Sequence, residues 1–347
     1  MTRPRDGLRS VEPYVSPQIE VPVRLNTNEC PYPLPDGFAG DLAERVRAIS
    51  LNRYPDRDAT ELRERLAAVS GLDPDRLWVA NGSNEVILQL LQAYAGSGRR
   101  ALVFEPTYLL HRRIPWITQT EVDAIDLDPP FDIGADAVER AVQGDAAVMF
   151  VCSPNNPTGG ARPVEVIEAL AASDALVIVD EAYIEFGGTS AVDLVRTHPN
   201  VVVVRTFSKA FSLAGARIGY CVASPDVVGD LRRVALPYHL SALTQAAGLT
   251  ALDHADEAMG ILDDIRAQRD RLLEGLSTLP EVEVFPSDAN FVLFRPPGAA
   301  DETWQELLDR GVLVRDLSEV VPGCLRVTAG TEQEVNAFLQ ALTEVLR

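Results

Sequence analysis

The chain has 347 residues, and 31 Lys and Arg against 51 Asp and Glu give it a formal net charge of −20. This length suggests two domains at roughly 150 residues each, and 46% hydrophobic residues can form a sizeable core, which excludes a disordered or collagen-like chain. The acidity argues against a nucleic-acid partner, and no apolar run approaches the roughly 20 residues that cross a bilayer.

Residues 1–40 resemble an extended arm, since they are rich in proline and show no helical pattern. We expect this arm to lie over another part of the molecule or over a second subunit. Residues 1–10 lack the apolar segment of a secretory signal. The four cysteines are widely spaced, so neither a disulfide framework nor a metal site is expected, and we predict a cytoplasmic protein.

Residues 41–236 alternate between helical and strand-like patterns. Short apolar runs predict buried strands, at residues 77–80, 101–104, 146–152, 176–179, 201–205 and 217–222. Amphipathic segments predict helices, at residues 60–69, 85–94 and 163–172. This alternation predicts an α/β fold, namely a large domain with a mainly parallel central sheet flanked by helices.

Residues 237–347 follow a different pattern, and Pro237 marks a plausible boundary. A long charged helix at residues 255–279 comes first. Short strands and two further helices follow, at residues 282–285, 291–294, 301–309, 312–315, 325–327 and 332–346. This part predicts a smaller α+β domain.

Polar residues follow five of the predicted strands directly. The segments after residues 80, 104, 152, 179 and 205 carry Ser83, Tyr108, Asn156, Asp180 and Lys209. Because ligands bind at the carboxyl ends of strands in an open α/β sheet, these segments are expected to meet in one crevice. No G-x-G-x-x-G, Walker A or G-x-S-x-G motif competes for it.

Lys209 is the only lysine beside 30 arginines. Arginine cannot serve as a reactive amine because its guanidinium stays protonated. The single lysine is therefore either an accident or is kept for amine chemistry.

The neighbouring residue types suit a phosphorylated cofactor. Ser83 and Asn84 open a predicted helix, whose N-terminal amides favour a phosphate, although Ser83 could simply cap the helix. Thr206, Ser208 and Arg217 could bind the same phosphate. Asp180 leaves an apolar strand and needs a cationic partner, which a protonated ring nitrogen would supply.

Longer motifs resemble a known family. Residues 153–159 (SPNNPTG), 180–183 (DEAY) and 206–211 (TFSKAF), with Arg217, resemble the fold-type I pyridoxal-phosphate aminotransferases of classes I and II. The spacing matches as well, with 24 residues from Asn156 to Asp180 and 29 from Asp180 to Lys209. Further motifs resemble the histidinol-phosphate aminotransferases, at residues 25–33 (LNTNECPYP), 52–56 (NRYPD), 81–85 (NGSNE), 314–316 (VRD) and 325–330 (LRVTAG).

The resemblance implies a role for each matching residue. Lys209 binds pyridoxal 5'-phosphate covalently, Asp180 pairs with its ring nitrogen, and Tyr183 is the third catalytic residue. Tyr183 and Asn156 bind the ring hydroxyl oxygen, and Tyr108 stacks on the ring. The phosphate is held by Ser83, Asn84, Thr206, Ser208, Arg217 and, from the neighbouring subunit of a homodimer, Tyr54.

The resemblance also implies the substrates. Arg326 binds the acidic group of the substrate, with Arg315, Tyr14 and Asn156 nearby. The implied reaction is transamination of L-histidinol phosphate with 2-oxoglutarate, giving imidazole acetol phosphate and L-glutamate, as in histidine biosynthesis. One arginine can serve a phosphate and a carboxylate, because its planar fork pairs with either.

Other functions remain open. An aromatic amino-acid aminotransferase would use Arg326 for an α-carboxylate, and a phosphothreonine-type decarboxylase shares the cofactor motifs. A transcription regulator with an aminotransferase-like domain would need an additional DNA-binding domain, yet the sheet-forming region starts by about residue 77 and the preceding arm is proline-rich and acidic. An inactive scaffold would have no reason to keep Lys209 as its only lysine. The sequence gives no physical argument for a role of His239.

Overall fold

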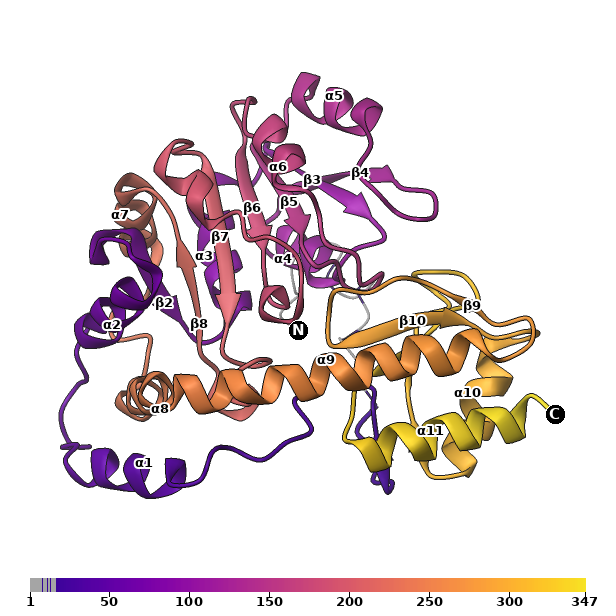
Figure 1. Ribbon diagram of the computed structural model, residues 1–347. Helices are drawn as coiled ribbons and strands as arrows, with labels where there is room; N and C mark the ends of the chain where they lie inside the picture. The colour runs from indigo at the N-terminus through magenta and orange to yellow at the C-terminus, as the bar shows by residue number, and fades with distance from the viewer. Residues whose placement is uncertain (1–7, 9–10, 12, 14–16) are drawn as a thin grey trace, which may run out of the picture.

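The structure, a computed structural model, describes residues 8, 11, 13 and 17–347. Within these residues the strands form three sheets. The largest has seven strands in the order β2-β8-β7-β6-β5-β3-β4 (Figure 1). Its strands are β2 (Leu77–Ala80), β3 (Arg100–Glu105), β4 (Glu121–Asp126), β5 (Val148–Cys152), β6 (Leu176–Asp180), β7 (Val201–Thr206) and β8 (Gly219–Val222).

Six of these strands share one direction. β8 is antiparallel to both of its neighbours, β2 and β7, so β2 again runs parallel to β7. The remaining pairs, from β7 across to β4, are all parallel. The five strands that precede the polar segments therefore end at the same edge of the sheet, as the sequence predicts.

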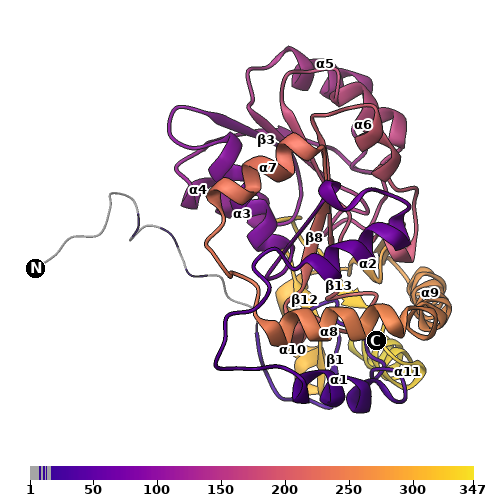
Figure 2. The same ribbon diagram turned by 90° about the vertical axis from the view of Figure 1, so that its left-hand side faces the viewer.

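Both faces of the seven-stranded sheet are buried, which is why its strands are continuous apolar runs. Val177 and Val179 face one hydrophobic cluster, whereas Ile178 between them faces another. One face packs against α3 (Ser83–Tyr94), α4 (Leu110–Ile117) and α7 (Pro225–Val234) (Figure 2). The other packs against α2 (Thr60–Ser70), α5 (Ala135–Gln143), α6 (Val164–Leu170) and α8 (Ala242–Asp253).

A smaller region holds the second core. Its antiparallel sheet has the order β12-β13-β10-β9, with β9 (Glu283–Val284), β10 (Phe291–Arg295), β12 (Arg315–Asp316) and β13 (Leu325–Thr328). Helices α10 (Ala300–Asp309) and α11 (Glu332–Val345) pack beside it, and α9 (Ala255–Ser277) extends to it from α8 (Figure 1). This arrangement confirms the predicted α/β fold with a smaller α+β part.

The segment after residue 17 joins the smaller region. Strand β1 (Val23–Arg24) pairs in parallel with β11 (Val312–Leu313), and α1 (Phe38–Arg47) then packs on α8. The predicted strand at 312–315 is therefore two strands, because β11 pairs with β1 and β12 pairs with β13. Short 3₁₀ helices complete the fold, at Pro74–Arg76, Ile184–Phe186, Val192–Arg196 and Ala214–Ala216.

Candidate functional site

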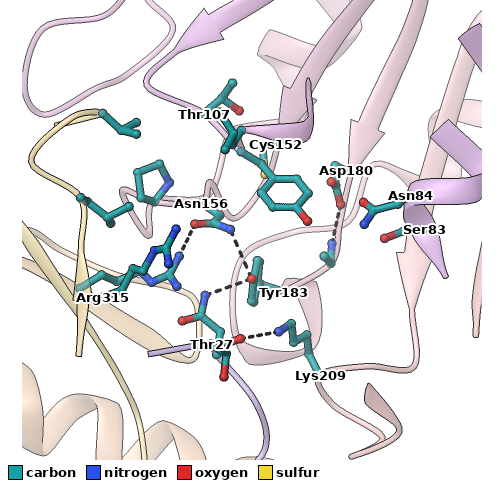
Figure 3. Close-up of a pocket in the computed structure, with 18 of the residues that line it drawn as sticks. Thr27, Ser83, Asn84, Thr107, Cys152, Asn156, Asp180, Tyr183, Lys209 and Arg315 are labelled. Carbon is teal, nitrogen blue, oxygen red and sulfur yellow. Dashed lines mark hydrogen bonds between the residues drawn. The ribbon is translucent and has the colours of Figure 1, made fainter. Parts of the chain in front are cut away.

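A cavity of about 960 Å³ lies where the strands of the seven-stranded sheet end and the smaller region begins (Figure 3). Twelve of the predicted site residues line it: Ser83, Asn84, Tyr108, Asn156, Asp180, Tyr183, Thr206, Ser208, Lys209, Arg217, Arg315 and Arg326. Tyr54 does not line it, and Tyr14 lies outside the described residues. The crevice predicted from the five strand ends is therefore present.

Lys209 follows β7 and reaches across the cavity towards the N-terminal segment. Its Nζ donates a hydrogen bond to the Thr27 carbonyl oxygen at 2.9 Å and lies 5.8 Å from the centre of the Tyr183 ring (Figure 3). Burial of the amine, and then the positive charge of Arg326, lower the pKa of Lys209 to about 7. Glu29 acts in the opposite direction. The amine is consequently available in its neutral, nucleophilic form near neutral pH.

This pKa predicts how the only lysine reacts. In the cofactor-free protein, the acylation rate of Lys209 should rise as the pH increases through about 7, because the neutral amine is the reactive form. An ordinary lysine would reach half of its maximal rate near pH 10.4. Peptide mapping after brief labelling across a pH series measures this rate and separates Lys209 from the α-amino group. Half-maximal labelling near pH 10 would contradict the depressed pKa.

Asp180 ends β6, where its carboxylate is buried with 3% of the residue exposed. Oδ1 accepts a hydrogen bond from the Ala182 amide at 3.1 Å, and Oδ2 lies 3.0 Å from His111 Nε2. A carboxylate can only accept, so His111 carries its proton on Nε2, and its Nδ1 faces the Thr107 hydroxyl at 3.2 Å. The carboxylate is thus held rigidly while it lines the cavity.

Arg326, Asn156 and Tyr183 form a connected group on the side of the smaller region. Arg326 lies on β13 and donates to Asn156 Oδ1 at 2.6 Å and to the Asn26 carbonyl oxygen at 3.0 Å. Asn156 Nδ2 in turn lies 3.5 Å from the Tyr183 hydroxyl (Figure 3). Arg315 on the neighbouring β12 pairs in register with Arg326 and also lines the cavity. Two arginines therefore lie near one end of the cavity.

Hydroxyl groups and an arginine gather at the opposite side. The Ser208 hydroxyl accepts from Thr206 Oγ1 at 2.9 Å and from Arg217 Nη1 at 3.3 Å. The strand predicted at residues 217–222 begins only at Gly219, as β8. Arg217 lies before it in a left-handed conformation (φ 54°), which turns the chain. That turn directs the guanidinium towards the cavity.

The start of α3 completes this group. Gly82, not Ser83, is the residue before the helix, and it lies so close to Arg217 that a Cβ there would be 2.5 Å from Nη2. Gly219 approaches as closely, because a Cβ on it would be 2.1 Å from the Ser83 nitrogen. Asn84 Oδ1 is buried and has no hydrogen-bond partner among the described residues. The helix N-terminus and Arg217 fit a phosphate, whose oxygens accept from both, and the amide of Asn84 would have to present its Nδ2 to it.

Two aromatic or imidazole residues singled out from the sequence lie outside the cavity. Tyr54 is 80% exposed and stacks on Tyr238, with ring centres 4.4 Å apart. His239 does not line the cavity; its Nε2 binds the Val79 carbonyl oxygen at 2.8 Å, and its ring stacks on Trp78. The structure thus gives His239 a role in packing.

Sequence reasoning missed three contributors. His111 is fully buried and supports Asp180, and its only signal is its place three residues after Tyr108. Asn28 contacts the Tyr183 hydroxyl, and Thr27 contacts Lys209 through its main chain. Both belong to the LNTNECPYP motif at residues 25–33, whose residue types alone do not point to these contacts.

The chain is similar to known proteins over nearly its whole length. Residues 20–342 match the family model described as aminotransferase class I and II. A histidinol-phosphate aminotransferase from Frankia casuarinae is 49% identical over 359 aligned positions, which cover 99% of this chain and 90% of the relative.

Two solved structures share the fold. Histidinol-phosphate aminotransferase from Sinorhizobium meliloti, in complex with pyridoxal-5'-phosphate, superposes with a TM-score of 0.88 at 21% identity, covering 99% of this chain and 97% of that one. L-threonine-O-3-phosphate decarboxylase from Porphyromonas gingivalis gives 0.83 at 26% identity, covering 93% and 99%. Because the family model matches residues 20–342 and the Frankia protein is 49% identical over 99% of the chain, the chain belongs to the class I and II aminotransferases and, within them, to the histidinol-phosphate aminotransferase family.

Proposed function

We propose that this protein transfers the amino group of L-histidinol phosphate to 2-oxoglutarate, with pyridoxal 5'-phosphate as its cofactor. The products would be imidazole acetol phosphate and L-glutamate, in histidine biosynthesis. One observation carries the proposal: the only lysine, with a pKa lowered to about 7, shares a cavity with the rigid carboxylate of Asp180 and with Arg315 and Arg326 near one end.

The cavity residues would hold the cofactor at three places. Its phosphate suits the side that holds Ser83, Asn84, Thr206, Ser208 and Arg217. Asp180 would face the ring nitrogen, Tyr183 and Asn156 the ring hydroxyl oxygen, and Tyr108 the ring plane. When bound, pyridoxal phosphate supplies an electron sink for the electron pair left on the substrate carbon.

Lys209 carries the proton-transfer part of the mechanism. With the cofactor bound, its neutral amine could take the proton from the substrate carbon and deliver it to the cofactor, because a pKa near 7 suits both proton uptake and proton release at neutral pH. Asp180 keeps a fixed negative charge opposite, since the Ala182 amide and His111 hold both of its oxygens.

The arginines would bind the acidic end of each substrate. Arg326 is buried, and one nitrogen is fixed by Asn156 and another by the Asn26 carbonyl. Arg315 and Tyr14 are proposed to complete this site. A planar guanidinium pairs with a phosphate in one half-reaction and with a carboxylate in the other.

A spectroscopic titration tests the proposed function. The loaded protein should lose its visible absorption band and gain the near-ultraviolet band of the aminated cofactor at low L-histidinol phosphate, but only at high L-phenylalanine. The reverse order would identify an aromatic aminotransferase. Carbon dioxide release from O-phospho-L-threonine would identify the decarboxylase.

The substrate end predicts the effect of removing Arg326. Arg326→Gln should raise the KM for L-histidinol phosphate about 10- to 100-fold, because a hydrogen bond to a charged group contributes about 1.5–3 kcal/mol. Steady-state kinetics with both substrates measure this change. Arg295→Gln, on β10 outside the cavity, is the matched control. An unchanged KM would remove Arg326 from the substrate site.

We also propose a cytoplasmic homodimer in which Tyr54 reaches the cofactor phosphate of the partner. In one chain Tyr54 is exposed and outside the cavity, and it stacks on Tyr238 beside the exposed Leu236. An exposed apolar group of this kind is typical of an interface. The division into residues 1–40, 41–236 and 237–347 stays a prediction, with α8 joining the two regions.

Mixing two inactive or weakened chains tests the dimer. Lys209→Ala and Tyr54→Ala homodimers should each be impaired at limiting cofactor. In the hybrid, the site that keeps Lys209 receives Tyr54 from the other chain, so co-refolding should restore about half of the native activity per hybrid dimer. Activity no higher than that of the Tyr54→Ala parent would show that Tyr54 does not act across an interface.

A further inference from the structure

We propose that Asn28 is a positioning residue that turns the hydroxyl proton of Tyr183 into the cavity. The proposal rests on the proposed function, because this proton would be donated to the ring hydroxyl oxygen of pyridoxal phosphate. Asn28 comes from the N-terminal segment, far from Tyr183 in the sequence, and its Nδ2 lies 3.0 Å from the Tyr183 hydroxyl oxygen.

The Tyr183 hydroxyl is placed between two amide groups. The residue is 5% exposed, and its oxygen receives Asn28 Nδ2 on one side and Asn156 Nδ2 at 3.5 Å on the other (Figure 3). A phenol oxygen has two lone pairs and one proton. If both lone pairs accept from amides, the proton must point in a third direction, and we assign this direction to the cavity because Tyr183 lines it.

The orientation of Asn156 follows from its other neighbour. Its Oδ1 lies 2.6 Å from Arg326 Nη1, and an arginine can only donate. The oxygen of the amide must therefore face Arg326. This leaves Nδ2 as the atom that faces Tyr183.

The orientation of Asn28 follows from Thr328. The Thr328 hydroxyl accepts a hydrogen bond from the Asn28 main-chain amide at 3.0 Å and donates its own proton to Asn28 Oδ1 at 3.2 Å. If the Asn28 amide were flipped, the buried Thr328 hydroxyl would lose the oxygen that accepts its proton, which is unfavourable. Nδ2 is thus the atom presented to Tyr183.

The main chain fixes Asn28 in this place. Its backbone is left-handed (φ 54°), a conformation that asparagine tolerates better than most residues. Its carbonyl oxygen accepts from Asn290 Nδ2 at 3.2 Å, and the Thr328 amide binds the carbonyl of Leu25. The same segment supplies the Thr27 carbonyl to Lys209, so one piece of chain orients two reacting groups.

The first test uses the cofactor-free protein and two variants that tolerate the left-handed backbone, Asn28→Asp and Asn28→Gly. Tyrosine is labelled with ¹³C at Cζ, and the Tyr183 resonance is assigned by its absence in Tyr183→Phe. It should shift in both Asn28 variants but not in Asn336→Asp, which adds the same charge on α11 outside the cavity. A Tyr183 resonance unmoved in both Asn28 variants overturns the proposal.

The second test is a pH titration of the visible band of the loaded protein. In Asn28→Asp the hydroxyl proton would turn to the new carboxylate. Because a hydrogen bond donated to the ring oxygen stabilises its charged form, losing it should raise the pH midpoint by about one unit. In a Tyr183→Phe background there is no hydroxyl proton to redirect, so the same substitution should move the pH midpoint by less than about 0.3 units. The four proteins form a double-mutant cycle that measures this coupling.

Equal shifts in both backgrounds would mean that the added charge acts directly and would overturn the proposal, as would no shift in either. Failure of the proposed function can be distinguished from failure of this proposal. A protein that forms no visible band, or that does not react with L-histidinol phosphate, still gives the Tyr183 resonance in the cofactor-free state.

Discussion

Replacing Lys209 with alanine is expected to lower the rate of amine transfer by at least about 10⁴-fold. Lys209 is the only side-chain amine in the protein, and its pKa of about 7 makes it the group that can move the substrate proton. General acid–base catalysis alone contributes up to about 10⁴-fold, and loss of the covalent link adds to this. Single-turnover absorbance with L-histidinol phosphate measures the rate.

Two controls separate amine chemistry from charge and from folding. Lys209→Arg keeps the charge but cannot lose its proton at neutral pH, so it should be as inactive as Lys209→Ala. Borohydride treatment of the loaded native protein should fix the cofactor on one peptide only, the one that contains Lys209, and on no side chain in the variants. Turnover within tenfold of native in either variant would refute the mechanism.

The central strands could be predicted because their local pattern and their environment agree. β5 and β6 are buried along their whole length, and each is a continuous apolar run in the sequence. That the five polar segments meet in one cavity then follows from the rule that ligands bind at the carboxyl ends of parallel strands. Most of the residues proposed to hold the cofactor could be named in this way because they lie within a few residues of a strand end, whereas Tyr54 does not.

One edge of the seven-stranded sheet, β4, could not be predicted for the opposite reason, whereas the other edge, β2, matches the predicted strand at residues 77–80. β4 is an edge strand whose acidic Glu121 and Asp123 pair with Arg100 on β3, and such polar edges lack an apolar pattern. Helix α4 was not predicted because it contains Pro115, a residue that normally argues against a helix interior.

Contacts across long sequence distances were equally hidden. Asn28 and Tyr183 are 155 residues apart, and His111 and Asp180 are 69 apart. A single asparagine or histidine carries no local signal of such a partner. Only the folded chain shows that β1 brings residues 26–28 to the cavity and that α4 places His111 beneath Asp180.

Asp180 provides the second large effect, and here activity and stability are expected to move in different directions. Asp180→Asn removes the negative charge that would keep the cofactor ring nitrogen protonated. A pair of opposite charges about 4 Å apart interacts by about 4 kcal/mol at an effective dielectric constant near 20, so the rate of amine transfer should fall about 10³-fold. Single-turnover absorbance measures this fall, with Asp123→Asn on the edge strand β4 as the matched control.

The cofactor-free Asp180→Asn protein should nevertheless be at least as stable as the native chain. Burying a carboxylate is costly, and an amide of the same shape keeps the contact with the Ala182 amide through its oxygen. His111 can accept from the new amide group by moving its proton from Nε2 to Nδ1, where the Thr107 hydroxyl can accept it. An unchanged or raised Tm with the rate loss would therefore assign Asp180 to the chemistry, whereas a lowered Tm with a rate within tenfold of native would assign it to the fold.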